Sequence, residues 1–174
     1  MSHINIEIKA RCSDHERIRK ILQSRHADYR GVDNQVDVYF NVSYGRLKLR
    51  KGDGENHLIF YTRKNQKGPK QSRIILYENH PTPVLEKILR NSLGTLISVN
   101  KTRETYHIGN VRFHLDKIRG LGDFIEIEAT DSNGEIRMEK LRQQCNHYMS
   151  LLEINQEDLV PESYSDLFKK FVKG

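Results

Sequence analysis

The sequence has little of what disulfide-rich secreted proteins and membrane proteins depend on. Its 174 residues include two cysteines and no tryptophan, and hydrophobic residues make up only 36% of the chain. Cys12 and Cys145 cannot build a disulfide framework and show no metal-site spacing, which is typical of a reducing compartment. No apolar run is long enough to span a bilayer, and the first predicted strand is charged by position 7. We therefore expect a cytoplasmic protein that has no signal segment and no membrane partner.

Charged residues, in contrast, are abundant. They make up 30% of the chain, and 29 Lys and Arg against 23 Asp and Glu give a formal net charge of +6. This excess suits a polyanionic partner, such as a nucleic acid, an anionic membrane or a highly charged small phosphate. Apolar residues still recur in periodic runs, and the length is sufficient to bury a core, so we expect residues 1–174 to form one domain.

The apolar periodicity is mainly that of β-strands. Asp53-Gly54 and Gly109-Asn110 mark tight turns between such runs. Residues 64–72 are polar, basic and interrupted by Gly-Pro, which predicts an exposed loop. The predicted strands cover about residues 3–11, 35–41, 46–51, 58–63, 73–78, 96–108, 111–118 and 123–130.

Helices are predicted between some of these strands. Ser13 and Glu16 have the spacing of a capping box, which predicts a helix that begins after Ser13. Thr82 followed by Pro83 has the pattern of an N-cap with proline in the first turn. A long helix is expected over about residues 135–152, and a short one from near Ser163. The fold class is therefore α+β, mostly antiparallel sheet with helices at its periphery.

The polar faces of the strands carry the chemistry. Near the start of the chain, Asn5, Glu7 and Lys9 share one face of a strand, and isoleucines occupy the other. Cations and carboxylates are segregated on later strands. The cations of this pattern are Arg46, Lys48, Arg50, Arg63, Arg73, Lys101 and Arg103, and the carboxylates are Asp116, Glu126 and Glu128.

Two interpretations of these faces remain open on alternation alone. A strand face can point at water, but like charges two residues apart destabilise a solvated sheet unless opposite charges lie between them. If the faces instead converge inside a barrel, cations stand opposite a carboxylate cluster. The carboxylates can then bind Mg²⁺ or Mn²⁺ through hard oxygen ligands, and the cations can bind phosphate oxygens.

The segment from Phe113 to Glu128 resembles the core motif of the CYTH superfamily, the triphosphate tunnel metalloenzymes. This superfamily includes class IV adenylyl cyclases, thiamine triphosphatases and inorganic tripolyphosphatases. The resemblance covers most of the chain, because the pieces at residues 5–9, 46–50, 63, 73 and 101–103 follow in the family's order and spacing.

The resemblance implies an eight-stranded antiparallel β-barrel that forms a tunnel for a small-molecule triphosphate. It implies Mg²⁺ or Mn²⁺ as cofactor and places Lys9 and Arg63 among the catalytic groups. The implied metal ligands are Glu7, Asp116, Glu126 and Glu128, and the implied triphosphate-binding residues are Lys9, Arg46, Lys48, Arg50, Arg63, Arg73, Lys101 and Arg103.

For the activity, the resemblance implies a class IV adenylyl cyclase-like enzyme that converts ATP to cyclic AMP and pyrophosphate. The alternatives are a triphosphatase acting on inorganic tripolyphosphate or thiamine triphosphate, and a non-catalytic binder of polyphosphate or RNA, although nucleic acid is not the expected partner. A homodimer is implied by similarity to the cyclases.

The sequence departs from the family pattern at three positions. The usual first strand reads Glu-x-Glu-x-Lys, and here Asn5 replaces the first acid. Acids often follow Arg73 at the second and fourth positions, where this chain has Ile75 and Tyr77. These differences leave open the number of metal ions and which triphosphate is bound.

Overall fold

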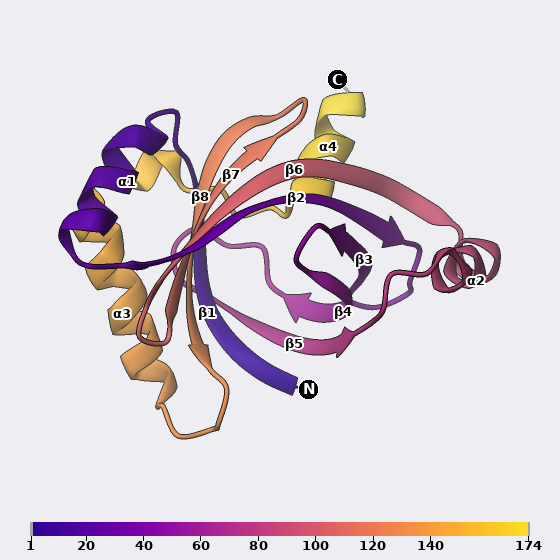
Figure 1. Cartoon of the computed structure of the whole chain (residues 1–174), viewed down its shortest axis with the longest axis horizontal. Helices are drawn as coiled ribbons and strands as arrows, with labels where there is room; N and C mark the ends of the chain where they lie inside the picture. The colour runs from indigo at the N-terminus through magenta and orange to yellow at the C-terminus, as the bar shows by residue number, and fades with distance from the viewer. Residues whose placement is uncertain (1, 174) are drawn as a thin grey trace.

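The computed structural model describes residues 2–173, in which eight antiparallel strands close into a barrel (Figure 1). Around the barrel the strand order is β1, β5, β4, β3, β2, β6, β7, β8, and the last strand pairs with the first. The strands are β1 (Ser2–Arg11), β2 (Asp28–Phe40), β3 (Arg46–Gly52), β4 (Asn56–Arg63), β5 (Lys70–Glu78), β6 (Thr95–Ile108), β7 (Val111–Ile118) and β8 (Gly122–Asp131). The expected fold class is confirmed.

The helices lie outside the barrel wall. They are α1 (His15–Ser24), α2 (Pro83–Leu93), α3 (Met138–Leu151) and α4 (Tyr164–Lys173), and a 3₁₀ turn covers Gln156–Asp158. In Figure 1, α1 and α3 lie together beside β1 and β8, α2 lies at the opposite side, and α4 stands over one end near the C-terminus. Within the described residues, no helix is long and apolar enough to cross a membrane.

The barrel is apolar on its outer wall, where the helices pack, and inside it carries many of the charged side chains of the strands beside a smaller apolar cluster. Ile6 and Ile8 of β1 point outward and are at most 1% exposed, because α1 and α3 cover them. The apolar stripe of α1, which includes Ile18 and Leu22, and Cys145 of α3 belong to the same core cluster. The apolar face of β1 is thus used outside, which leaves its alternate polar residues for the interior.

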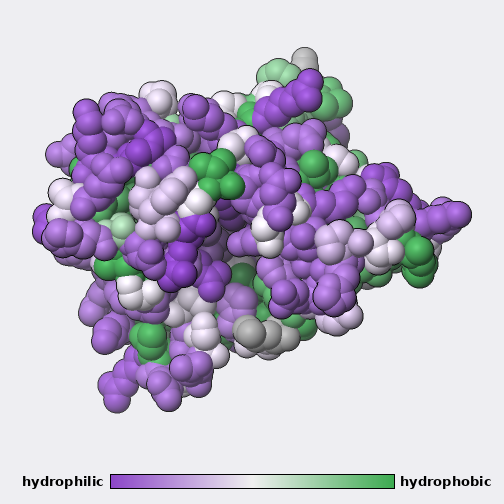
Figure 2. Space-filling view, in the orientation of Figure 1, coloured by the Kyte–Doolittle hydropathy of each residue, from purple (hydrophilic) through white to green (hydrophobic). Residues whose placement is uncertain are grey.

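A second core cluster lies under α2. Leu85 and Leu89 of this helix pack against Val38, Phe40 and Leu49 on the outer faces of β2 and β3. The other face of α2 is solvated, and its apolar residues appear as a small group at the right of Figure 2. Most of the face in that view is hydrophilic, as the high charge content requires.

Several predicted boundaries need correction. The N-cap of α1 is Asp14, whose carboxylate accepts the amide of Arg17 at 3.0 Å, and Ser13 precedes it. The α3 helix begins at Met138, three residues after its expected start, and β2 begins at Asp28 because a bulge at Gly31 lets the strand continue through the glycine. The N-cap of α2 is Thr82, as predicted, and the helix ends at the C-cap Gly94.

The predicted loop at residues 64–72 is also partly wrong. Its last three residues already pair with β1 and β4, so β5 starts at Lys70 rather than at Arg73. Lys70 and Ser72 are each 1% exposed. The change matters for function because it decides which side chains of β5 enter the barrel.

Candidate functional site

A cavity of about 140 Å³ lies inside the barrel, which we call the lumen. All eight strands and Tyr164 contribute to its lining, and Asn5 and Lys9 are only 1% and 4% exposed there. The polar face of the first strand is therefore enclosed rather than solvated. The ionisable residues that line the lumen are His3, Glu7, Lys9, Tyr39, Lys48, Arg50, Glu55, His57, Tyr61, Arg63, Lys101, Arg103, Arg112, His114, Glu126, Glu128 and Tyr164.

One buried carboxylate organises three of the lumen cations. Asp37 of β2 accepts hydrogen bonds from Arg50 Nε and Nη2 at 2.9 and 3.0 Å, from Lys48 at 2.8 Å and from Lys101 at 3.4 Å. Burial opposes ionisation of Asp37, but Arg50, Lys101 and Lys48 outweigh it and hold its pKa well below the ordinary value. Burial and two neighbouring guanidinium groups lower the pKa of Lys101 to about 7. Asp37 was not predicted as a site residue, although it is an acid flanked by two valines, Val36 and Val38, on this strand.

A second buried carboxylate holds the remaining cation of β6. Arg103 donates Nε and Nη2 to the two oxygens of Asp116 at 2.7 and 2.6 Å, and Nη2 also reaches Glu126 at 2.9 Å. The hydroxyl of Tyr164 donates to Asp116 at 2.7 Å. Burial opposes ionisation of Asp116, but Arg103 outweighs it and lowers the pKa of the carboxyl. Asp116 thus lies behind Arg103 and does not line the lumen cavity itself.

Further carboxylates line the neighbouring strands β1 and β8, where Glu7 lies opposite Glu128 and Lys9 opposite Glu126. Glu7 pairs with Arg63, and the ammonium of Lys9 lies 3.3 Å from Glu126. Burial disfavours the charged form of Glu126, yet Lys9 and other cations hold its pKa well below the ordinary value. Glu7 and Glu126 are therefore each turned toward a cation.

Glu7, Glu126 and Glu128 together form what we call the carboxylate corner, and the chemistry of their side chains fits a divalent metal ion. Glu7, Glu126 and Glu128 offer hard oxygen atoms on adjacent strands, the ligands that Mg²⁺ and Mn²⁺ prefer. Glu128 is 3.4 Å from Nε2 of His114, which lowers its pKa although burial opposes ionisation. Among the residues described, no group of three or more His, Cys, Asp or Glu side chains is already arranged to hold a metal ion. Metal binding would require these carboxylates to turn away from their cations.

Backbone carbonyl groups from the C-terminal segment bind two buried lysines, Lys70 and Lys9. The ammonium of Lys70 donates to the carbonyl oxygens of Val160 at 3.0 Å and Pro161 at 3.4 Å. Lys9 donates to the carbonyl of Glu162 at 3.3 Å. Burial, followed by the charge of a neighbouring arginine, lowers the pKa of Lys70 to about 7. No sequence pattern pointed to Lys70, because it follows Gly-Pro in a segment with the composition of a loop.

Unpartnered polar atoms gather where β1, β4 and β5 meet. Asn5 and Arg63 each lie opposite Ser72 in register. The Asn5 Oδ1, Ser72 Oγ and Arg63 Nε and Nη2 atoms are buried and have no hydrogen-bond partner in the described chain. Buried donors without an acceptor are costly, so the guanidinium of Arg63 is set up to receive an oxygen-bearing ligand.

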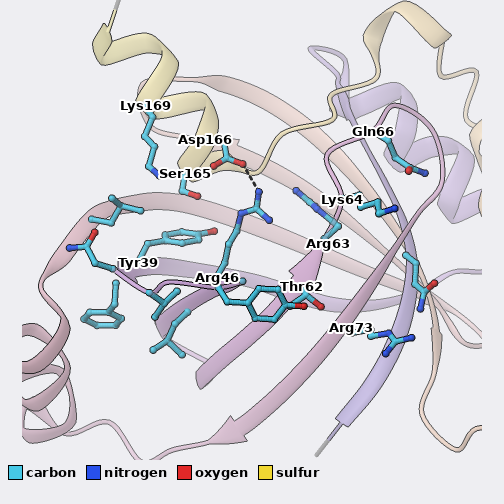
Figure 3. A pocket seen from close by; sticks show the side chains of 18 of the residues that line it. Tyr39, Arg46, Thr62, Arg63, Lys64, Gln66, Arg73, Ser165, Asp166 and Lys169 are labelled. Carbon is cyan, nitrogen blue, oxygen red and sulfur yellow. Dashed lines mark hydrogen bonds and ion pairs between the residues drawn. The ribbon is translucent and has the colours of Figure 1, made fainter.

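Two predicted cations lie outside the lumen cavity. Arg73 is exposed on the outer face of β5, because Ser72 and Ile74 on either side of it point inward. Its expected position inside the barrel is therefore wrong. Arg46 lines a larger pocket at the end of the barrel that α4 borders, where it pairs with Asp166 at 2.7 Å (Figure 3).

Comparisons with known proteins agree with this geometry. The family model of the CYTH domain matches residues 3–164. The chain belongs to the CYTH domain family. A family of triphosphate tunnel proteins accounts for a closed barrel whose inner wall is charged.

Three relatives illustrate the similarity of this CYTH chain. A protein of Methanocaldococcus jannaschii named "Putative adenylate cyclase" is 24% identical over 178 residues, which cover 94% of this chain and 98% of that protein. A structure from Pyrococcus horikoshii OT3 is 27% identical, with a TM-score of 0.79 and coverage of 94% and 98%. A Hippeastrum structure is 14% identical, with a TM-score of 0.66 and coverage of 97% and 96%, and is described as a "Putative adenylyl cyclase" that "reveals a dominant triphophatase activity".

Proposed function

We propose that the protein hydrolyses a phosphoanhydride bond of a linear triphosphate that lies in the lumen. The observation that supports this most directly is the guanidinium of Arg63, which is buried beside the cavity with two donors unpartnered. A phosphoryl oxygen is the acceptor that such a guanidinium binds best. The described lumen lining also supplies Lys9, Lys48, Arg50 and Lys101 from four other positions of the wall.

In this proposal the cations bind and orient the phosphate chain. Lys9 and Arg63, which lie beside Glu126 and Glu7, are close enough to the carboxylate corner to stabilise negative charge at the bond that breaks. Positioning and charge stabilisation supply most of the catalysis in phosphoryl transfer, so no covalent intermediate is needed. Asp37 serves as a positioning residue, because it fixes three of the cations from behind.

A divalent metal would be held by Glu7, Glu126 and Glu128. When bound, it would neutralise phosphoryl charge and activate the attacking water. Asp116, predicted as a further ligand, is occupied by Arg103 and Tyr164, so we assign it the orientation of Arg103.

Cyclisation of ATP is the second candidate. It is favoured by the apolar side of the lumen, where Ile59, Ile74 and Leu76 lie beside His57 and offer contacts for a nucleobase. The name of the Methanocaldococcus relative points the same way. The Hippeastrum protein, described with dominant triphosphatase activity, has the same fold, and therefore hydrolysis is tested first.

The experiment incubates the protein with tripolyphosphate, ATP or thiamine triphosphate, each with Mg²⁺ or Mn²⁺, and measures phosphate, pyrophosphate and cyclic AMP separately. Hydrolysis predicts phosphate or pyrophosphate without cyclic AMP. Glu126→Ala should abolish metal-dependent turnover, whereas Glu139→Gln, on an exposed face of α3, should not change it. Circular dichroism of both variants checks that they are folded. Full activity of Glu126→Ala, or no turnover of any substrate by the wild type, would rule the proposal out.

A further inference from the structure

A second cavity, which we call the outer pocket, opens beside the lumen. It measures about 920 Å³ and is bordered by the turn between β2 and β3, the loop between β4 and β5, and α4 (Figure 3). Tyr39 and Arg63 line both cavities, so the outer pocket begins where the lumen ends. A ligand that leaves the lumen at this end enters the outer pocket.

The outer pocket is strongly cationic. Its lining includes Arg46, Arg63, Lys64, Arg73, Arg142 and Lys169, and Asp166 is the one carboxylate among its lining residues in the described chain. Burial opposes ionisation of Asp166, but its hydrogen bond to Arg46 lowers the pKa to about 2, so this pair is neutral as a unit.

Three of these cations have free side chains. Lys64, Arg73 and Lys169 are exposed, and none of their side chains forms a hydrogen bond or ion pair within residues 2–173. Figure 3 shows that they come from three different elements around the pocket. A concave surface with uncompensated charge of one sign concentrates ions of the opposite sign. The pocket therefore favours a ligand that continues to present negative charge outside the lumen.

We propose that the substrate is a linear inorganic polyphosphate longer than three phosphates. Its end lies in the lumen and its following phosphates lie in the outer pocket, on Lys64, Arg73 and Lys169. This inference rests on the proposed function, because it assumes that a phosphate chain enters the lumen. It also assigns a role to Arg73, which cannot act inside the barrel.

The composition of the outer pocket favours bare phosphate over a nucleic acid. Single-stranded nucleic acids are held largely by stacking of bases on aromatic side chains. Tyr39 and Phe40 in this lining are only 3% and 2% exposed, which leaves Tyr44, 72% exposed and tilted against Phe60, as the one exposed aromatic ring of the described lining. Cations and side-chain amides outnumber this single exposed ring in the lining, and they bind phosphate oxygens without any base.

The test is direct binding of tripolyphosphate and of a longer linear polyphosphate of defined length, compared at equal concentration of chain ends. It is done in EDTA, so that turnover does not consume the ligand. The variant carries Lys64→Ala, Arg73→Ala and Lys169→Ala together. The control carries Lys20→Ala, Lys87→Ala and Lys117→Ala, which remove the same charge from exposed positions outside the outer pocket. A 5′-triphosphorylated RNA serves as the competing ligand.

We expect the wild type to bind the longer chain more tightly than tripolyphosphate. The triple variant should lose about tenfold in affinity for the longer chain and less than about twofold for tripolyphosphate. The slope of log affinity against log salt concentration for the longer chain should fall in magnitude by about 2, at roughly 0.7 per lost phosphate contact. In the control variant, the affinities for the longer chain and for tripolyphosphate should change by the same factor.

Other outcomes overturn the inference. Equal affinity of the wild type for both chain lengths, or an equal loss for both in the variant and in the control, would leave the outer pocket without a role. Tighter binding of the RNA than of polyphosphate, lost in the variant, would assign the pocket to nucleic acid. If tripolyphosphate itself fails to bind, the proposed function fails; if it binds and a longer chain gains nothing, only this inference fails.

Discussion

The carboxylate of Asp37 offers a sharp test of how the lumen is built. It is 1% exposed and binds Arg50 through two hydrogen bonds, together with Lys48 and Lys101. In Asp37→Asn the side chain keeps its shape but loses its charge, and its amide group turns hydrogen atoms toward buried cations. Breaking a buried ion pair by removing one partner costs about 3–5 kcal/mol, because the other charge stays buried and uncompensated.

We therefore expect Asp37→Asn to lower the free energy of unfolding at pH 7 by about 3–5 kcal/mol. At about 2–4 °C per kcal/mol for a chain of this size, the midpoint of thermal unfolding should fall by roughly 6–20 °C. Urea unfolding followed by circular dichroism measures the free energy directly. The matched control is Asp28→Asn on the same strand, since Asp28 and Arg30 are 60% and 55% exposed and such pairs contribute about 0–1 kcal/mol.

The pH dependence and the ligand response complete this test. Because the pKa of Asp37 is depressed, its contribution is present above the ordinary value of 3.8 and is lost as the pH falls through the lower value in the folded protein. The wild type and Asp37→Asn should therefore converge in stability in strong acid. Tripolyphosphate should stabilise the variant more than the wild type, because it supplies the missing negative charge. A loss below about 1 kcal/mol at pH 7 would refute the reasoning, since a buried charge would then be dispensable.

Three further predictions concern other groups. Tyr164→Phe removes the hydroxyl that donates to Asp116 at 2.7 Å and should cost about 1.5–3 kcal/mol in urea unfolding; an unchanged midpoint would contradict the bond. Lys70 and Lys101 have pKa values of about 7 instead of 10.5. Binding of a triphosphate should raise these pKa values, so the lysines should take up protons from solution when the complex forms, and the affinity should fall as the pH rises above 7. Calorimetry in buffers of different ionisation enthalpy measures the proton uptake, and binding without proton uptake would refute this prediction. Phe113→Ala, at 0% exposure in the core under the helices, should cost about 3–5 kcal/mol in urea unfolding without changing tripolyphosphate affinity below the melting range; a smaller cost would contradict its packing.

The residues that the sequence predicted best lie on strands with one clear polar face. Arg46, Lys48 and Arg50 alternate with leucines, so only one register places the leucines under a helix, with Lys48 and Arg50 in the lumen and Arg46 at the end of the barrel. The same holds for Glu126 and Glu128, because the alternating Ile125 and Ile127 pack in the outer core. For these strands the period of two decided the direction of every side chain.

Strand β5 shows why the rest could not be predicted. Residues Ile74 to Tyr77 are apolar on both faces, so alternation indicates no inward side, and the inward position of Arg73 was predicted from its charge and from the family resemblance. In the barrel the inward residues are Ser72, Ile74 and Leu76, while Ile75 and Tyr77 are exposed by 56% and 64%. The start of the strand at Lys70 depends on pairing with β1, a contact distant in sequence. Local pattern carries no information about such a contact.

The pairing of Glu126 with Lys9 leads to a last prediction, in which two effects have opposite signs. Lys9 lies 3.3 Å from Glu126, and a phosphoryl oxygen must compete with that carboxylate for the ammonium group. Glu126→Gln removes the competitor's charge, so metal-free binding of tripolyphosphate should tighten, by about tenfold if roughly 1.4 kcal/mol of charge attraction is released. Metal-dependent turnover should be lost in the same variant, because the carboxylate is also a proposed metal ligand. The control is Glu104→Gln, whose carboxylate binds Arg19 on the outer wall and should leave binding unchanged. Weaker metal-free binding by Glu126→Gln would show that Glu126 positions Lys9 for the phosphate and does not withhold it.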